Sequence, residues 1–226
     1  MGSGIATACL LAGMRVVLKE AQASFLEAGM GRIGANLASR VKKGQMSESD
    51  MQKALGSVSP VLDYAGFDQV DIVIEAVIEH LPLKQSIFKE CEARCRPDCI
   101  LSTNTSTIDI TKVGASMQQP QRLVGVHFFS PAHVMPLLEI IRTPQTPKEV
   151  LVDCIGLAGK IGKVPVVVGN CTGFAVNRVF FPYTMAATML VDMGADVFVV
   201  DQCIAGFGEL LQRYSDAPAV REKIDR

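Results

Sequence analysis

The segment Asp71-Ile72-Val73-Ile74 carries the clearest indication of the fold class, because an unbroken apolar, β-branched run follows a single acid. Such a run is typical of a parallel strand that helices bury on both faces. Further strands are expected on either side of it, at residues 15–18, 100–102, 123–128, 137–142 and 164–168. Segments with helical patterns separate most of these strands, at 5–12, 22–43, 47–55, 82–95, from Ser106 onward and at 148–160. This alternation predicts an α/β fold with a doubly wound sheet.

The pattern changes after Gly169. Residues 174–193 and 196–206 are expected to be helical, with no strand between them. We therefore place a domain boundary near residue 170.

The composition indicates a folded protein with a sizeable core. Of its 226 residues, 49% are hydrophobic and 20% are charged, so global disorder is not expected. A formal net charge of −1 and the lack of Trp give no reason to expect nucleic acid as a partner. The most apolar long segment, 173–191, contains Arg178 and Pro182, which argues against membrane insertion.

Seven cysteines without a signal peptide indicate a reducing compartment. Cys91, Cys95 and Cys99 are spaced by four residues, which raises the alternative of a metal cluster. The spacing matches no zinc pattern, and Pro97 would break a helix that carried all three. We expect a structural role for them and no metal.

The first residues, Met1-Gly2-Ser3-Gly4, match the end of a glycine-rich turn that binds a dinucleotide. Glu20 follows the next expected strand, eighteen residues after Gly2. An acid at that position accepts hydrogen bonds from a ribose 2′-hydroxyl and repels a 2′-phosphate, which favours NAD over NADP. The alternative is that Glu20 is a surface acid beside Lys19. The ends of two later strands, 76–79 and 104–106, lie where a sheet of this type binds ligands.

His127 and Glu139 are the candidate catalytic pair. Glu139 lies within the apolar segment 137–141, and His127 ends the apolar run 123–126. A buried carboxylate needs a partner, and two adjacent strands would bring the imidazole to it. A carboxylate that fixes the tautomer of a histidine is typical of a general base.

With these residues in place, the chain resembles the L-3-hydroxyacyl-CoA dehydrogenase family, and within it the dehydrogenase part of plant peroxisomal β-oxidation multifunctional proteins. The resemblance extends from residue 1 to about residue 208. The stretches that carry it are MGSGIA (1–6), VVLKE (16–20), DIVIEAVIE (71–79), STNTSTI (102–108), HFFSPAHVMPLLEI (127–140) and GNCTGFAVNRVFFPY (169–183).

The resemblance implies a Rossmann-type NAD-binding domain at 1–170 and a partial all-helical dehydrogenase domain at 171–226. It implies NAD-dependent oxidation of a 3-hydroxyacyl-CoA to the 3-oxoacyl-CoA, with an acyl-CoA as the substrate. It also implies a peroxisomal location.

The resemblance assigns roles to single residues of this chain. His127 matches the catalytic base and Glu139 its carboxylate partner, while Ser106 and Asn177 match polar residues that hold the substrate. Lys43 lies near a basic residue that contacts the CoA moiety. The cofactor-contacting positions are expected to be Gly2, Gly4, Glu20, Ala76, Glu79, Lys84, Asn104 and Ser106. The alternative for Ser106 is that it is only a helix cap. Without the resemblance, Asn177 is better interpreted as an interhelical hydrogen-bonding residue.

The chain departs from the family pattern at both ends. The family's first strand and two earlier glycines are expected to be missing, and the likeness stops near Phe207-Gly208. Two alternatives therefore stay open beside the dehydrogenase. One is a catalytically inactive, truncated form of a multifunctional β-oxidation protein. The other is an enzyme for a shorter substrate, such as 3-hydroxybutyryl-CoA.

Overall fold

A computed structural model describes residues 1–206 of the protein. The chain divides into two compact units, Met1–Ala175 and Val176–Arg226. The boundary predicted near residue 170 falls in the turn that precedes this division. The assignment of the two units as an NAD-binding and a dehydrogenase domain stays a prediction.

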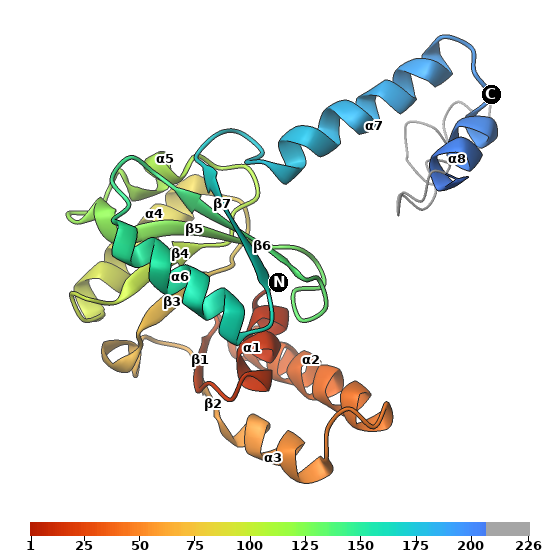
Figure 1. Ribbon diagram of the computed structural model, residues 1–226. Helices are drawn as coiled ribbons and strands as arrows, with labels where there is room; N and C mark the ends of the chain where they lie inside the picture. The colour runs from red at the N-terminus through yellow and green to blue at the C-terminus, as the bar shows by residue number, and fades with distance from the viewer. Residues whose placement is uncertain (207–226) are drawn as a thin grey trace. The chain divides into compact units, whose positions relative to one another are not determined.

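The strands of the first unit form two sheets (Figure 1). The smaller sheet pairs β1 (Val16–Lys19) in parallel with β2 (Val58–Val61). The larger sheet has five strands in chain order, β3 (Ile72–Glu75), β4 (Ile100–Thr103), β5 (Leu123–Phe128), β6 (Leu137–Arg142) and β7 (Val164–Gly169). All neighbours in it are parallel except β5 and β6. The predicted α/β class is confirmed, with a mixed sheet.

The strand β2 was absent from the sequence prediction. Its residues are Val-Ser-Pro-Val, and Pro60 lacks the amide proton that a central strand needs. In the described residues β2 pairs only with β1, so it is an edge strand, where proline is tolerated.

The two sheets are separate because β1 and β3 are not hydrogen-bonded to each other. Each has one neighbouring strand within the described part of the chain, so each leaves one edge unpaired.

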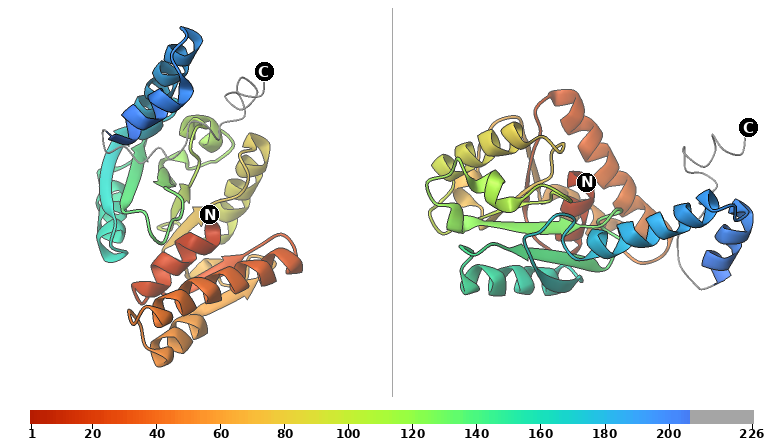
Figure 2. Two further views of the ribbon diagram at one scale, coloured as in Figure 1. Left: turned by 90° about the vertical axis from the view of Figure 1, so that its right-hand side faces the viewer. Right: turned by 90° about the horizontal axis from the view of Figure 1, so that it is seen from above.

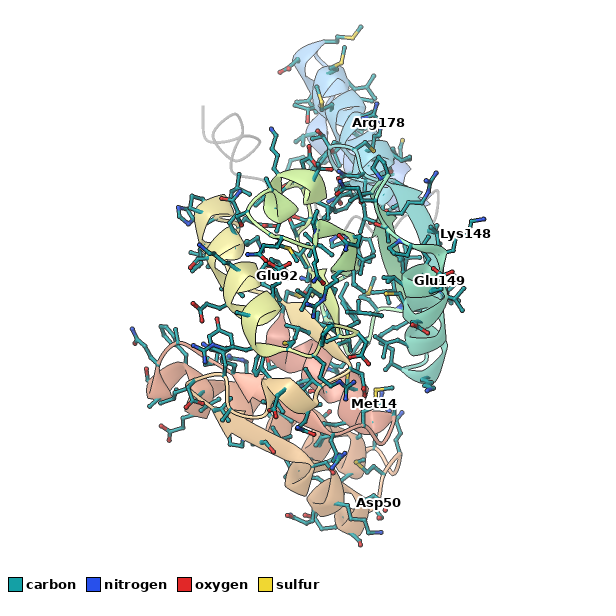
Figure 3. All side chains as sticks on the ribbon, turned by 90° about the vertical axis from the view of Figure 1, so that its left-hand side faces the viewer. Met14, Asp50, Glu92, Lys148, Glu149 and Arg178 are labelled. Atoms are coloured by element: carbon teal, nitrogen blue, oxygen red, sulfur yellow. The ribbon has the colours of Figure 1, made fainter. Side chains whose placement is uncertain are left out.

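The first unit has six α-helices, and all except α5 lie close to the predicted positions. They are α1 (Gly2–Leu11), α2 (Ala23–Lys42), α3 (Glu48–Gly56), α4 (Leu81–Arg94), α5 (Ile110–Gly114) and α6 (Lys148–Lys160). Ser47 caps α3 as expected, since its side chain accepts a hydrogen bond from the Asp50 amide at 3.1 Å. Charged residues such as Asp50 of α3 and Lys148 and Glu149 of α6 project from the exposed sides of these helices (Figure 3).

The prediction that Ser106 begins a helix was wrong. The helix α5 starts at Ile110, and its cap is Asp109, which accepts from the Thr111 amide at 2.8 Å. The hydroxyl of Thr105 instead accepts hydrogen bonds from the amides of Thr107 and Ile108. The turn after β4 is thus closed by Thr105, and the side chain of Ser106 is not used as a cap.

Helices cover both faces of the larger sheet, with α4 and α5 on one face and α6 on the other (Figure 2). On the first face Phe88 of α4 and Ile110 of α5 pack against Leu101 and Leu123. On the second face Cys154 of α6 packs against Val126 and neighbouring strand residues. The central strand β5 is therefore buried on both sides, whereas the run at 71–74, on which the prediction was based, is only half-buried.

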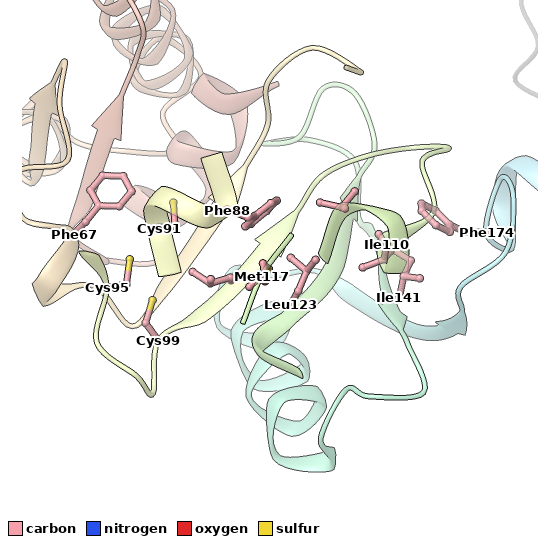
Figure 4. Packing of buried hydrophobic residues seen from close by; sticks show 12 residues of the cluster. Phe67, Phe88, Cys91, Cys95, Cys99, Ile110, Met117, Leu123, Ile141 and Phe174 are labelled. Carbon is pink, nitrogen blue, oxygen red and sulfur yellow. The ribbon is translucent and has the colours of Figure 1, made fainter. Parts of the chain in front are cut away.

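The cysteines Cys91, Cys95 and Cys99 lie in the first of these cores (Figure 4). A hydrogen bond to Cys91, together with burial, raises the pKa of Cys95 to about 11. A protonated thiol is a poor nucleophile and a poor metal ligand. The three side chains contribute to apolar packing, which agrees with their predicted structural role.

The described part of the second unit is helical. It consists of α7 (Val176–Asp192), which contains Pro182, and α8 (Val197–Gly206). Among residues 1–206, no helix combines the length and the apolar character needed to cross a membrane.

Candidate active site

His127 and Glu139 stand directly opposite each other on β5 and β6. The antiparallel register pairs the two residues, and His127 Nδ1 lies 2.8 Å from Glu139 Oε2. The His127 side chain is 8% exposed and that of Glu139 is fully buried. The predicted pairing is confirmed. An ionised carboxylate only accepts hydrogen bonds, so Nδ1 carries the proton and Nε2 is the basic nitrogen.

The second oxygen of Glu139 is also held. The amide of Ala175 donates to Glu139 Oε1 at 3.0 Å. That amide follows a tight turn in which Gly173 and Phe174 both have positive φ, 75° and 50°. A positive φ at phenylalanine is uncommon and needs support from its surroundings. The Phe174 ring is 1% exposed, so burial provides that support.

Two phenylalanine rings flank the imidazole. The ring centroids of Phe129 and Phe174 lie 4.5 Å and 5.9 Å from that of His127. Together with the bond to Glu139, they fix the plane of the imidazole. A general base with a fixed ring and a fixed tautomer is prepared to accept a proton at one defined place.

Glu79 and Ser106 meet at the carboxyl ends of β3 and β4. Glu79 Oε1 accepts hydrogen bonds from the Ser106 amide at 2.8 Å and from Ser106 Oγ at 3.3 Å. Thr105 Oγ1 donates to the same carboxylate at 3.0 Å. Partial burial alone would raise the pKa of Glu79, but the Ser106 amide, the Lys84 ammonium and the two hydroxyls hold it below its ordinary value.

Asn104 connects the carboxyl end of β4, next to Ser106, to the strand that carries His127. Its side-chain Oδ1 accepts a hydrogen bond from the Phe128 amide at 2.8 Å. The end of β4 and the end of β5 are therefore tied together, one residue from the imidazole. Ala76 directly follows β3 at the same edge of the sheet.

Lys84 was predicted to contact the cofactor, but its side chain is only 1% exposed. Its Nζ lies 2.8 Å from Glu75 Oε1 and 3.5 Å from Glu79 Oε2. Sequence reasoning missed Glu75. The signal that could have found it was the one that revealed Glu139, an acid at the end of an apolar strand.

The amino end of α1 carries the two glycines predicted to contact a dinucleotide. No side chain caps its first amides, and a Cβ placed on Gly2 would meet no atom within 4 Å. A Cβ on Gly4 would lie 3.3 Å from Ala132 Cβ, so a glycine there permits close packing. Free amides at a helix start bind anions. Glu20 follows β1, the position expected for an acid that binds ribose.

A cleft of about 240 Å³ opens beside this helix, and a second of about 350 Å³ adjoins it. Lys43 lines the second cleft, together with Arg40 and His133. The basic side chains suit an anionic ligand. Asn177 belongs to α7 in the second unit, so its predicted contact with the substrate stays a prediction.

Known proteins are similar to this chain in sequence and in fold. Residues 1–171 match the family model described as "3-hydroxyacyl-CoA dehydrogenase, NAD binding domain". The peroxisomal fatty acid beta-oxidation multifunctional protein MFP2 of Arabidopsis thaliana is 56% identical over 208 residues, which are 92% of this chain and 29% of that protein. The fatty acid oxidation complex subunit alpha of Psychrobacter arcticus is 42% identical over the same shares. The chain thus spans less than a third of the length of these relatives.

A solved structure gives the same fold. The (S)-3-hydroxybutyryl-CoA dehydrogenase from Ralstonia eutropha superposes with a TM-score of 0.90 at 33% identity. The match covers 93% of this chain and 75% of that one. The 3-hydroxybutyryl-CoA dehydrogenase of Escherichia coli has a TM-score of 0.84 at 36% identity, over 87% of this chain and 42% of that one.

Proposed function

The chain belongs to the 3-hydroxyacyl-CoA dehydrogenase family, and we propose that it takes part in the NAD-dependent oxidation of (S)-3-hydroxyacyl-CoA to 3-oxoacyl-CoA in fatty-acid β-oxidation. The observation that carries the proposal is the buried His127–Glu139 pair, because it supplies a general base with a defined basic nitrogen. The matched NAD-binding domain supplies the place for the hydride acceptor.

The proton of the 3-hydroxyl group would pass to His127 Nε2. The resulting imidazolium is stabilised by the carboxylate of Glu139, which already accepts the Nδ1 proton at 2.8 Å. General-base catalysis of this kind contributes roughly 10²–10⁴-fold to the rate. Bound NAD⁺ supplies the chemistry of hydride acceptance at C3 of the substrate.

Polar groups around the dyad would hold the reactants. Ser106 would donate a hydrogen bond to the oxygen at C3, and Asn177 would help to hold the substrate. Lys43, at the basic cleft, would contact the CoA moiety. The amides of α1 would bind the pyrophosphate and Glu20 the adenosine ribose, while Ala76, Glu79 and Asn104 border the rest of the cofactor.

The relatives favour a peroxisomal location, since the multifunctional proteins of Arabidopsis thaliana and Oryza sativa subsp. japonica are named as peroxisomal. They leave the acyl chain length open. The likeness to two 3-hydroxybutyryl-CoA dehydrogenases supports a short-chain substrate as a second candidate.

The catalytically inactive alternative has its own supporting observation. The unpaired edges of β1 and β3 leave the two sheets of the nucleotide-binding unit unjoined. An unjoined sheet would weaken the alignment of α1 and β1 with β3, and these three elements carry the residues expected to bind the cofactor.

A titration of the purified chain with NADH, followed by fluorescence and by thermal melting, is the first test. We expect saturable binding and a raised melting temperature, because a ligand that binds the folded state stabilises it. Oxidation of 3-hydroxyacyl-CoA substrates of increasing chain length then separates long-chain from short-chain preference. NADH binding without turnover of any acyl-CoA would contradict the proposed activity and favour the inactive alternative.

A further inference from the structure

A buried polar cluster lies behind the contact between Glu79 and Ser106. Its centre is Glu75, the last residue of β3, which is 5% exposed. Lys84 Nζ lies 2.8 Å and 3.0 Å from its two carboxylate oxygens. Thr103 Oγ1 donates to Oε2 at 2.7 Å, and the Val77 amide donates to Oε1 at 2.6 Å. Each of the two carboxylate oxygens of Glu75 therefore accepts two hydrogen bonds.

The cluster continues to the candidate active site through Glu79. Lys84 Nζ is 3.5 Å from Glu79 Oε2, and Glu79 Oε1 accepts from the Ser106 amide at 2.8 Å. An unbroken series of charged and hydrogen-bonded contacts thus connects β3, α4 and the turn after β4. It ends at Ser106, which the proposed function places against the reacting oxygen.

The ammonium of Lys84 is buried between two carboxylates. Its Nζ donates to both oxygens of Glu75 and lies within ion-pair distance of Glu79. Removing this ammonium alone would leave Glu75 without its cation, and an unpaired buried charge is costly. The contact with Glu79 gives Lys84 a second partner, at the carboxyl end of β3.

We propose that Lys84 and Glu75 are positioning residues, which hold Glu79 and through it Ser106 in place at the carboxyl ends of β3 and β4. We call this pair the Glu75–Lys84 clamp. Glu75 fixes the ammonium from the strand side, and the ammonium fixes Glu79 from the helix side. Glu79 in turn holds the main chain and the side chain of Ser106. The proposal rests on the proposed dehydrogenase function, since it assigns these residues to the orientation of the reactants.

The decisive variant replaces both members of the clamp, Glu75→Gln with Lys84→Met. A glutamine keeps hydrogen bonds to Thr103 and Val77, and a methionine fills the space of the lysine stem without a charge. Replacing a buried ion pair by uncharged residues of similar volume is often neutral for stability. The variant therefore removes the support of Glu79 without leaving an unpaired charge. The matched control is Lys89→Met, an exposed lysine of the same helix.

The kinetic result separates positioning from binding. We expect the double variant to melt within a few degrees of the parent chain and to lose about tenfold or more in kcat, because displacements on the order of 1 Å near the reacting groups cost roughly 10²-fold. The KM for the acyl-CoA should change less than kcat, because the CoA moiety is held elsewhere. Unchanged kcat in a folded double variant would overturn the proposal.

A second measurement does not depend on turnover. The amide of Ser106 donates to Glu79, so its hydrogen exchange, followed by NMR, reports on the order of this corner. We expect faster exchange at Ser106 in the double variant but not in Lys89→Met, with the amides of the central strand β5 unchanged. Unaltered protection of Ser106 would contradict the proposal even if the parent chain turns over no substrate. A parent chain without turnover but with the altered exchange would instead contradict only the dehydrogenase assignment.

Discussion

The first unit contains two buried carboxylates, Glu139 and Glu75, that lie in similar surroundings and have different partners. Both are on strands of the larger sheet, and both are at most 5% exposed. Glu139 is paired with an imidazole, whose second nitrogen stays available for chemistry. Glu75 is paired with a buried ammonium, which also forms an ion pair with Glu79. A buried acid therefore indicates a structured polar site. The second contact of its partner distinguishes the two cases: the imidazole beside Glu139 has a basic nitrogen for chemistry, whereas the ammonium beside Glu75 contacts another carboxylate.

The largest expected effect is on kcat, when the histidine paired with Glu139 is replaced. Replacing His127 with Ala should lower kcat by roughly 10²–10⁴-fold, because the general base is lost. NADH affinity should stay close to that of the parent chain, since His127 is not among the residues expected to bind the cofactor. Steady-state kinetics with a 3-hydroxyacyl-CoA, alongside a melting curve, checks both statements. A fully active variant would refute the role given to His127.

The next largest effect is expected on the stability of the folded chain when only one member of the Glu75–Lys84 clamp is replaced. Replacing Lys84 alone with Met leaves Glu75 as a buried carboxylate without its cation, which costs about 3–5 kcal/mol. Urea unfolding of Lys84→Met beside the Glu75→Gln, Lys84→Met double variant measures this cost. The double variant should recover most of the lost stability. Equal stability of the two variants would mean that Glu75 does not depend on the charge of Lys84.

The third effect tests the packing between β5 and β6, whose register places His127 opposite Glu139. Gly125 lies on β5, two residues before His127, and a Cβ there would lie 2.7 Å from Ile141 Cβ on β6. Gly125→Ala should cost roughly 1–3 kcal/mol, the usual range for overpacking a core. The matched control is Gly156→Ala in α6, where an added Cβ would meet no atom within 4 Å. If both substitutions left the unfolding free energy unchanged, the close approach of β5 to β6 would not constrain the register.

The sequence contained enough information to predict the dyad but not the clamp. Apolar runs indicated β5 and β6. Each run contains one polar residue, His127 or Glu139, and a buried carboxylate needs a partner, so the two were expected to pair. Lys84 was expected to contact the cofactor because of its position in the family resemblance, which does not indicate burial. Its burial depends on Glu75, which faces it only because the chain turns back from β3 into α4. Such a pairing is a tertiary property that no local pattern contains.

The same limit explains two errors in the fold. The strand β2 was missed because Ser59 and Pro60 have low strand propensity, yet pairing with β1 outweighs that preference. Ser106 was taken as a helix cap because it precedes an apolar run, whereas the structure gives the turn to Thr105 and the cap to Asp109. In both places the preference of a single residue type did not decide the local structure.

The smallest expected effect concerns the pH dependence of Glu79, the residue that receives the support of the clamp. Its pKa in the folded chain is lowered from the ordinary 4.5, with the Ser106 amide and Lys84 outweighing the effect of partial burial. A carboxylate with a lowered folded-state pKa contributes stability above its unfolded pKa and loses that contribution as the pH falls through the folded value. The parent chain should therefore be more stable than Glu79→Gln at pH 7, and the difference should shrink below about pH 4. The gap will be small because the Glu79 side chain is 40% exposed and solvent screens its interactions. Melting curves of both proteins at several pH values measure it, and a gap that widened towards acid pH would show that the charge of Glu79 destabilises the folded chain.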